Sequence, residues 1–113
     1  MIKEDFIYDA YVVSVYDGDT ITVDFDLGFD LFLKNQKIRL YGIDAPELKG
    51  AEKLSGLTSR DWLREKVLNK NIVIKTHKDV KEKYGRWLGE VYVDDLYINE
   101  QLITEGLAIK YIE

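Results

Sequence analysis

The sequence predicts a mainly β fold with helices: a five-stranded Greek-key barrel of the OB type, with one helix between the third and fourth strands and a short helix after the fifth. Two observations lead to this fold class. The first half of the chain alternates apolar and polar residues as strands do, and the second half brings a helical segment, two further strands and a short helix. At 113 residues the chain can bury one modest core, and no repeat or linker divides it. We therefore expect a single domain over residues 1–113.

The first two strands are predicted at residues 7–16 and 20–27. The first is rich in β-branched and aromatic residues, and the second alternates between apolar and polar side chains. The "DGD" motif between them has turn chemistry, because glycine permits positive φ and aspartate accepts local backbone hydrogen bonds. Asp19 is therefore expected at the start of a strand, where its side chain can be aimed.

The third strand is predicted at residues 37–43, with Arg39 pointing away from its apolar neighbours. Pro46, the only proline, ends this strand because it keeps the preceding residue extended and has no N–H to donate. Asp44 and Glu47 are thereby fixed near a rigid corner.

A loop to about Gly56 and then a helix over residues 57–69 are expected after this corner. Thr58 and Asp61 have the spacing of a capping box at the start of such a helix. The helix separates the first three strands from the last two, as the OB fold requires.

The last two strands are predicted at residues 71–77 and 87–98, the second of them bent or turned at Asp94 and Asp95. A short helix over residues 99–105 follows and is closed by a glycine.

The chain has a net charge of −5, which is the wrong sign for general attraction to nucleic acid. The charge is unevenly distributed, however. Residues 66–86 carry seven Lys or Arg against two acidic residues, whereas residues 1–32 carry one Lys against eight acidic residues. A basic surface beside an acidic pocket would have this pattern, although a lysine-rich stretch is more often simply a solvent-exposed face.

The absence of cysteine excludes disulfides and thiolate metal sites. His77 is the only histidine, and an ordinary residue at a strand end is the better interpretation of it. The N-terminal "MIKEDFIYDAY" lacks the apolar stretch of a signal peptide, and no segment reaches transmembrane length. We expect a cytoplasmic monomer without membrane contact, or a secreted protein if a leader has been removed.

Three short motifs concentrate the residues that can carry chemistry: "YDGDT" at 16–20, "IRLYGIDAPE" at 38–47 and "KYGR" at 83–86. Their carboxylates are hard oxygen ligands, and their arginines are guanidinium forks that hold phosphate in a bidentate manner. A divalent cation needs the former and a phosphate needs the latter, so metal-assisted hydrolysis of a phosphodiester would use both. The candidates are Asp17, Asp19, Arg39, Asp44, Glu47 and Arg86.

Each motif alone has a simpler interpretation: a surface turn, a decorated corner, or a loop with a left-handed glycine. Together they are more specific, because a half-buried cluster of carboxylates repels itself unless a cation or the arginines neutralise it. The residues by themselves leave the metal open between Ca²⁺ and Mg²⁺.

In this order and spacing, "DGDT", "IRLYGIDAPE", "EKYGRWLGEVYVDD" and "NEQLITEGLA" resemble the staphylococcal nuclease, or thermonuclease, family. The resemblance extends from about residue 10 to residue 111. It implies an OB-fold enzyme that uses calcium to cleave phosphodiesters of DNA and RNA, preferably single-stranded, and leaves 3′-phosphate products.

The resemblance implies that Asp19 and Asp44 bind Ca²⁺ through their carboxylates and that Ala45 contributes its backbone carbonyl. The founding member of the family has threonine where this chain has Ala45, so a backbone ligand is retained but a hydroxyl contact is not. Asp17 would act behind the ligands without binding the metal itself.

Glu47 resembles the general base of the family, and Arg39 and Arg86 resemble its two phosphate-holding arginines. Lys83 and Tyr84 resemble the pair beside the terminal phosphate. The chain is longer between "DGDT" and "IRL" than in the founding member, which suggests a flap over the site.

Tyr111 resembles a tyrosine that packs against the nucleotide.

Two further functions stay open on the sequence. One is an OB barrel that binds nucleic acid or a protein without catalysis. The other is a structural calcium-binding domain, which leaves the two arginines unexplained because like charges beside a cation disfavour its binding.

Overall fold

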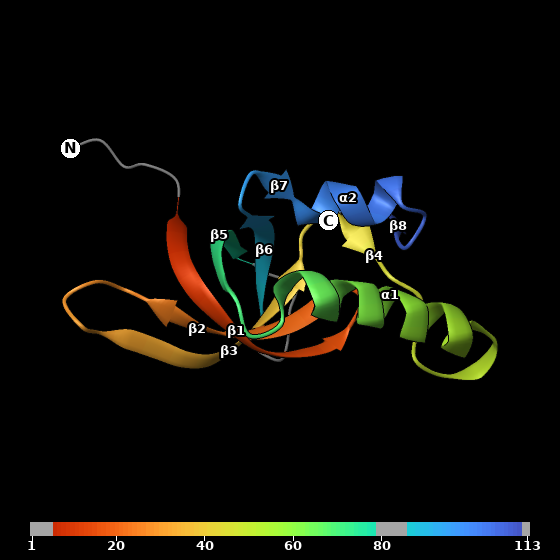
Figure 1. Cartoon of the computed structure of the whole chain (residues 1–113), viewed down its shortest axis with the longest axis horizontal. Coiled ribbons are helices and arrows are strands. Elements are labelled where there is room, and N and C mark those ends of the chain that lie inside the picture. Colours follow the sequence, from red (N-terminus) through yellow and green to blue (C-terminus); the bar gives the residue numbers. More distant parts are fainter. Residues whose placement is uncertain (1–5, 79–85, 112–113) are drawn as a thin grey trace.

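The computed structural model describes residues 6–78 and 86–111. Five strands form a closed barrel, in which neighbours follow the order β3-β2-β1-β5-β6 and a parallel pairing of β3 with β6 closes the ring (Figure 1). This confirms the predicted barrel. The strands are β1 (Ile7–Asp17), β2 (Thr20–Asp26), β3 (Phe32–Leu40), β5 (Asn71–Lys78) and β6 (Trp87–Val93).

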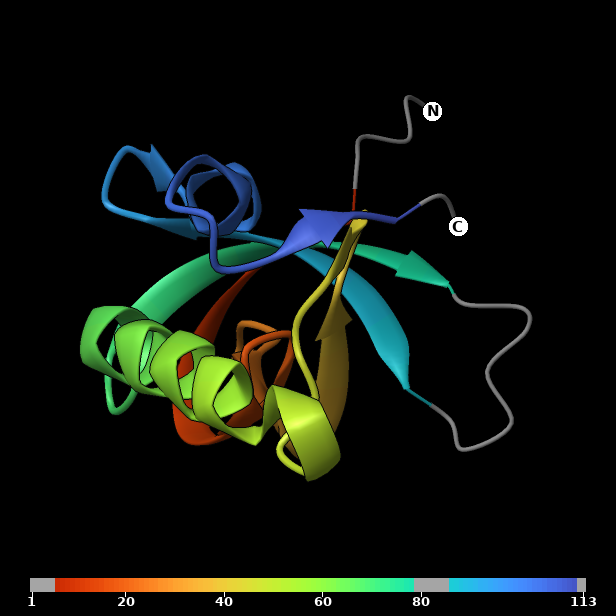
Figure 2. The same cartoon turned by 90° about the vertical axis from the view of Figure 1, so that its right-hand side faces the viewer.

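The remaining elements surround this barrel (Figure 2). The predicted turn at Asp94 and Asp95 separates β6 from β7, and a second small sheet pairs β4 with β8. Within the described residues, no helix has the length and apolar character needed to cross a membrane. The elements are β4 (Ile43–Asp44), the 3₁₀ helix η1 (Gly50–Glu52), α1 (Lys53–Val67), β7 (Leu96–Tyr97), α2 (Ile98–Thr104) and β8 (Ile109–Lys110).

The core forms from the strand faces that the alternation predicted. Ile21, Val23 and Phe25 of β2 are buried, and helix α1 adds Leu63 and Val67 to the same apolar cluster. Burying such side chains stabilises the fold by roughly 1.5–3 kcal/mol each. Because the apolar face of each strand packs into the core, its polar face lies on the outside of the barrel, where its side chains can contact other molecules.

Helix α1 begins earlier than the sequence indicated, at Lys53 instead of residue 57. The hydroxyl of Thr58 donates to the carbonyl of Leu54 inside the helix, at 2.9 Å, so Thr58 does not cap the N-terminus and the expected capping box is wrong. Gly56 had suggested a loop. It lies in the helix because it packs against the backbone of Glu47, where a side chain would not fit.

Strand β3 also begins earlier, at Phe32, and forms a long hairpin with β2. In this hairpin Asp26 pairs with Phe32 near the tip, whereas Thr20 pairs with Arg39 at the other end. The tip extends away from the barrel (Figure 1). The longer segment is therefore a strand extension pointing away from Arg39, and the expected flap over the site is not formed by it.

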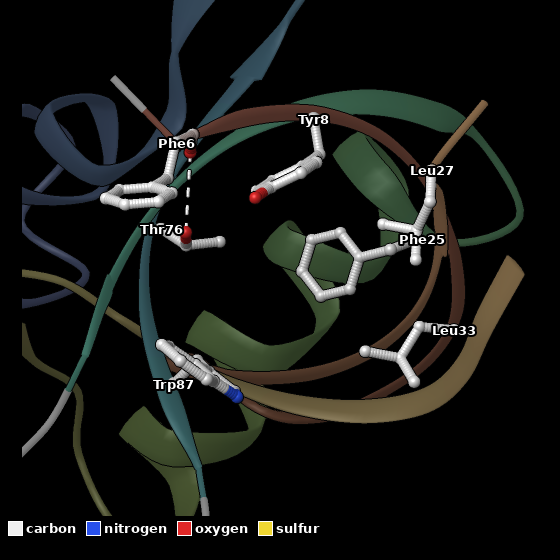
Figure 3. A pocket seen from close by; sticks show the side chains of 7 residues that line it. All are labelled: Phe6, Tyr8, Phe25, Leu27, Leu33, Thr76 and Trp87. Atoms are coloured by element: carbon white, nitrogen blue, oxygen red, sulfur yellow. Dashed lines mark hydrogen bonds between the residues drawn. The ribbon is translucent and has the colours of Figure 1, made fainter. Parts of the chain in front are cut away.

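One mouth of the barrel is open and apolar. Figure 3 shows this pocket inside the ring of strands, with α1 behind the ring. Its volume is about 590 Å³, and none of the predicted site residues lines it. This lining has no cationic side chain to hold a phosphate, so it is not the site that the sequence motifs predict. The lining residues are Phe6, Tyr8, Phe25, Leu27, Leu33, Thr76 and Trp87.

Candidate functional site

The turn between β1 and β2 positions the first two carboxylates. The Oδ1 atom of Asp17 accepts a hydrogen bond from the N–H of Asp19 at 3.0 Å, which is the local turn contact expected of aspartate. A Cβ on Gly18 would lie only 2.8 Å from the Cβ atoms of Ala45 and Ser59. The turn thus needs glycine because it packs closely between the second motif and α1.

Asp19 links the first motif to the second. Its side chain is almost fully buried, and its Oδ2 atom accepts the backbone N–H of Ala45 at 2.9 Å. Its Oδ1 atom accepts the hydroxyl of Thr20 at 3.0 Å. These bonds fix the orientation of the carboxylate, so its remaining lone pairs are held in one direction.

Arg39 lies between the two predicted metal ligands. Its Nη2 atom is 3.3 Å from Oδ1 of Asp44 and 3.8 Å from Oδ2 of Asp19. The guanidinium also lies over the ring of Tyr111, 4.9 Å from the ring centroid. Both carboxylates therefore converge on one cationic nitrogen, and Tyr111 lies at the edge of the same site.

Glu47 is held in place by its backbone. Its N–H donates to Oε1 of Glu52 at 3.2 Å, and its carbonyl lies against Gly56 of α1. Its side chain is exposed to solvent. The segment after Pro46 is thus attached to the start of the helix while the carboxylate remains accessible.

A single cavity of about 870 Å³ is lined by residues of all three motifs. Arg86 joins it because β6 runs parallel to β3, with Trp87 beside Ile38. The other two predicted substrate contacts, Lys83 and Tyr84, lie outside the described residues. The predicted site residues in the lining are Asp17, Asp19, Arg39, Asp44, Ala45, Glu47 and Arg86.

Three further cations line the same cavity, and the sequence analysis missed them: Lys37, Arg60 and Arg64. Together with Arg39 and Arg86 they give five cationic side chains against four carboxylates among the described lining residues. The cavity is therefore not acidic, although the whole chain is. The spacing of the two α1 arginines, four residues apart in a predicted helix, indicated that they share one helix face but not that this face lines the cavity.

The basic stretch at residues 66–86 contributes little to this cavity. Of its residues that the structure describes, Arg86 alone lines the pocket. His77 is also elsewhere: it lies 2.6 Å from Glu90 and stacks on Tyr41. That environment supports the structural interpretation of the histidine.

Asp17 has an unusual titration. Burial raises the pKa of its carboxyl from 3.8 to about 7, and the hydrogen bond and negative charge of Asp19 add to this increase. Because the carboxylates of Asp17 and Asp19 lie close together, their mutual repulsion favours the binding of a positively charged group beside them.

The residues present fit a calcium ion. Within the described residues no three acidic or histidine side chains form a cage, so protein carboxylates alone do not complete a site. Asp19 and Asp44 come close enough to share one cationic nitrogen, and Ala45, whose N–H donates to Asp19, lines the same cavity. Calcium accepts such a mixture of carboxylate, carbonyl and water oxygens.

The chain is similar to known proteins of one family. Residues 37–113 match the family described as staphylococcal nuclease homologue. A thermonuclease of Staphylococcus hyicus is 35% identical over 100 residues, which cover 86% of this chain and 56% of that protein. A protein named as an uncharacterized endonuclease of Escherichia coli O157:H7 is 37% identical over 101 residues, which cover 88% of this chain and 59% of that protein. This chain thus spans a little over half the length of both relatives.

Proposed function

The chain belongs to the staphylococcal nuclease family, and from this premise we propose that it is a calcium-dependent nuclease that hydrolyses phosphodiester bonds of DNA or RNA. We propose further that it prefers single strands and leaves 3′-phosphate ends. The observation that carries the proposal is the convergence of three sequence-distant motifs on one cavity, with Arg39 between Asp19 and Asp44.

Asp19, Asp44 and the backbone carbonyl of Ala45 would hold a calcium ion, which would supply Lewis-acid polarisation of a phosphate oxygen. Asp17 stands behind these ligands, because its side chain holds the N–H of Asp19. The hydrogen bonds of Asp19 with Ala45 and Thr20 hold its carboxylate in one orientation.

Glu47 takes the proton from the attacking water. Its carboxylate is exposed in the cavity while its backbone is anchored to α1, which suits a base that must reach water from a fixed position. Arg39 and Arg86 hold the negative charge that grows on the phosphate oxygens in the transition state. Tyr111 keeps the Arg39 guanidinium oriented and offers a face to the nucleotide.

A cleavage assay tests this function. Single-stranded DNA is incubated with the protein and Ca²⁺, then with a chelator, and the product ends are analysed. We expect chelator-sensitive cleavage with 3′-phosphate ends, and in Glu47→Gln retained calcium binding with most hydrolysis lost. Binding of DNA without cleavage would select the non-catalytic module instead, and calcium binding without either would select the structural calcium domain.

A further inference from the structure

We propose that Tyr16, Arg60 and Arg64 form a second subsite, which binds the nucleotide next to the scissile phosphate and thereby makes polymeric single strands the preferred substrate. This inference rests on the proposed nuclease function. The family resemblance assigns no role to these residues, although Tyr16 opens the first motif, and all three line the cavity.

The cavity is larger than the chemistry alone requires. Arg39 and Arg86 come from the β3 and β6 side, whereas Arg60 and Arg64 come from α1, which packs on β1 beside the β1–β2 turn (Figure 2). Pockets of roughly 300–1,000 Å³ enclose whole drug-sized ligands, and this one has about 870 Å³. It has room for a nucleotide beyond the phosphate that reacts.

The two helix arginines differ in how firmly they are held. Arg64 donates from Nη2 to the carbonyl of Val15 at 3.1 Å, which fixes the guanidinium against β1 and leaves further N–H donors available. Arg60 pairs with the neighbouring Asp61 at 3.0 Å, and the side chain of Asp61 is 64% exposed. The Arg60 side chain itself is 23% exposed, so the arginine is largely packed while its carboxylate partner faces water. An ion pair that is screened in this way on the carboxylate side contributes little stability, so Arg60 can exchange Asp61 for a phosphate.

Tyr16 completes the subsite. It directly follows Val15, the residue that anchors Arg64, and it lines the same cavity. Tyr16 is 68% exposed, so the ring contributes little to the core. An exposed aromatic ring beside cations is the arrangement that stacks a base while the phosphates are held electrostatically.

The test compares two substrates with wild type and variants. One substrate is a long single-stranded oligodeoxynucleotide, and the other is a nitrophenyl phosphodiester of a single nucleoside. Tyr16→Ala should raise the KM for the oligonucleotide roughly tenfold relative to the KM for the small ester, since stacking is worth about one decade or more per base. Arg60→Ala and Arg64→Ala should each lower the slope of log kcat/KM against log salt by about 0.7 on the oligonucleotide.

Lys66→Ala is the matched control. Lys66 is a cation of the same helix that lies over the ring of Trp62 and does not line the cavity. It should leave both substrates unaffected. The ion pair that Arg60→Ala removes is with the exposed carboxylate of Asp61, and Arg64→Lys tests the fork while keeping the charge.

The outcomes separate the two proposals. Equal losses on both substrates, or no loss on the oligonucleotide in any of the three variants, would overturn the subsite and leave the nuclease function standing. A wild-type protein that cleaves neither substrate would overturn the nuclease function, and the subsite with it.

Discussion

Arg39 is the residue at which the first two motifs meet, because its guanidinium contacts both Asp19 and Asp44. Arg39→Lys keeps the charge but loses the planar fork, so we expect kcat on single-stranded DNA to fall by on the order of 10², as when one positioned electrostatic donor is removed. Lys34→Arg, an exposed cation exchange on the same strand, should leave kcat unchanged. Full turnover in Arg39→Lys would remove this residue from the site.

The raised pKa of Asp17 predicts that the stability of the calcium-free protein depends on pH. Its pKa is about 7 in the folded state against 3.8 for the ordinary group, so between these values the folded protein binds a proton that the unfolded chain has released. The free energy of unfolding should therefore fall as the pH rises from about 4 to 7, with the full loss above pH 7. Urea unfolding at a series of pH values measures this.

The Asp17→Asn variant isolates this contribution, because asparagine keeps an oxygen for the N–H of Asp19 but does not ionise. The stability of the variant relative to wild type should grow across the same pH interval. A difference that stays constant from acid to neutral pH would contradict the assigned titration.

The residue types of the site could be predicted from sequence, but not all of its members. Asp19 and Arg39 stand in motifs with recognisable chemistry, whereas Arg60 and Arg64 are ordinary helix residues until α1 is placed. The burial of Asp17 was equally hidden, because it depends on how the turn packs.

At the scale of elements, α1 and the Glu47 segment meet at Gly56. Gly→Ala in a helix normally stabilises by about 1 kcal/mol, but here the added Cβ would overlap the Glu47 carbonyl. We expect Gly56→Ala to lower the free energy of unfolding by roughly 1–3 kcal/mol, as overpacking does. The displaced Glu47 segment should also lower kcat by about tenfold or more. Chemical denaturation and the DNA cleavage assay measure the two effects.

Ser55→Ala is the control for this change, because Ser55 is the exposed neighbour on the same helix. It should alter neither quantity appreciably. A Gly56→Ala protein more stable than wild type would show that α1 does not approach the Glu47 backbone so closely.

Helices and strands were predicted correctly where the alternation of apolar and polar residues is strong, whereas the first residue of an element was predicted poorly. The alternation of β2 placed Ile21 and Val23 in the core correctly. The start of α1 was predicted too late because Gly56 and Thr58 resemble loop and cap residues, while their helical state depends on contacts with a distant segment.

At the scale of the whole molecule, calcium should stabilise the fold by binding the folded state alone. A calcium concentration about 100 times the Kd adds about 2.7 kcal/mol to the free energy of unfolding, which for a domain of this size raises Tm by roughly 10 °C. Asp44→Asn should abolish most of this increase without unfolding the protein, because the Asp44 side chain is half-exposed. Thermal scans with Ca²⁺, Mg²⁺ and chelator make the measurement, and equal shifts in variant and wild type would refute the assignment of Asp44.

The sequence by itself determined the kinds of residue and their local settings: alternating strands, an aspartate-glycine turn, a proline corner and the family motifs. These features depend on neighbours within a few residues, where propensity and periodicity act. The tertiary structure decided which side chains share a cavity. The parallel pairing of β3 with β6 brings Arg86 to Arg39, and the packing of α1 on β1 adds its arginines to the same space. Such contacts join residues far apart in the chain, and they form only when the whole core is buried at once.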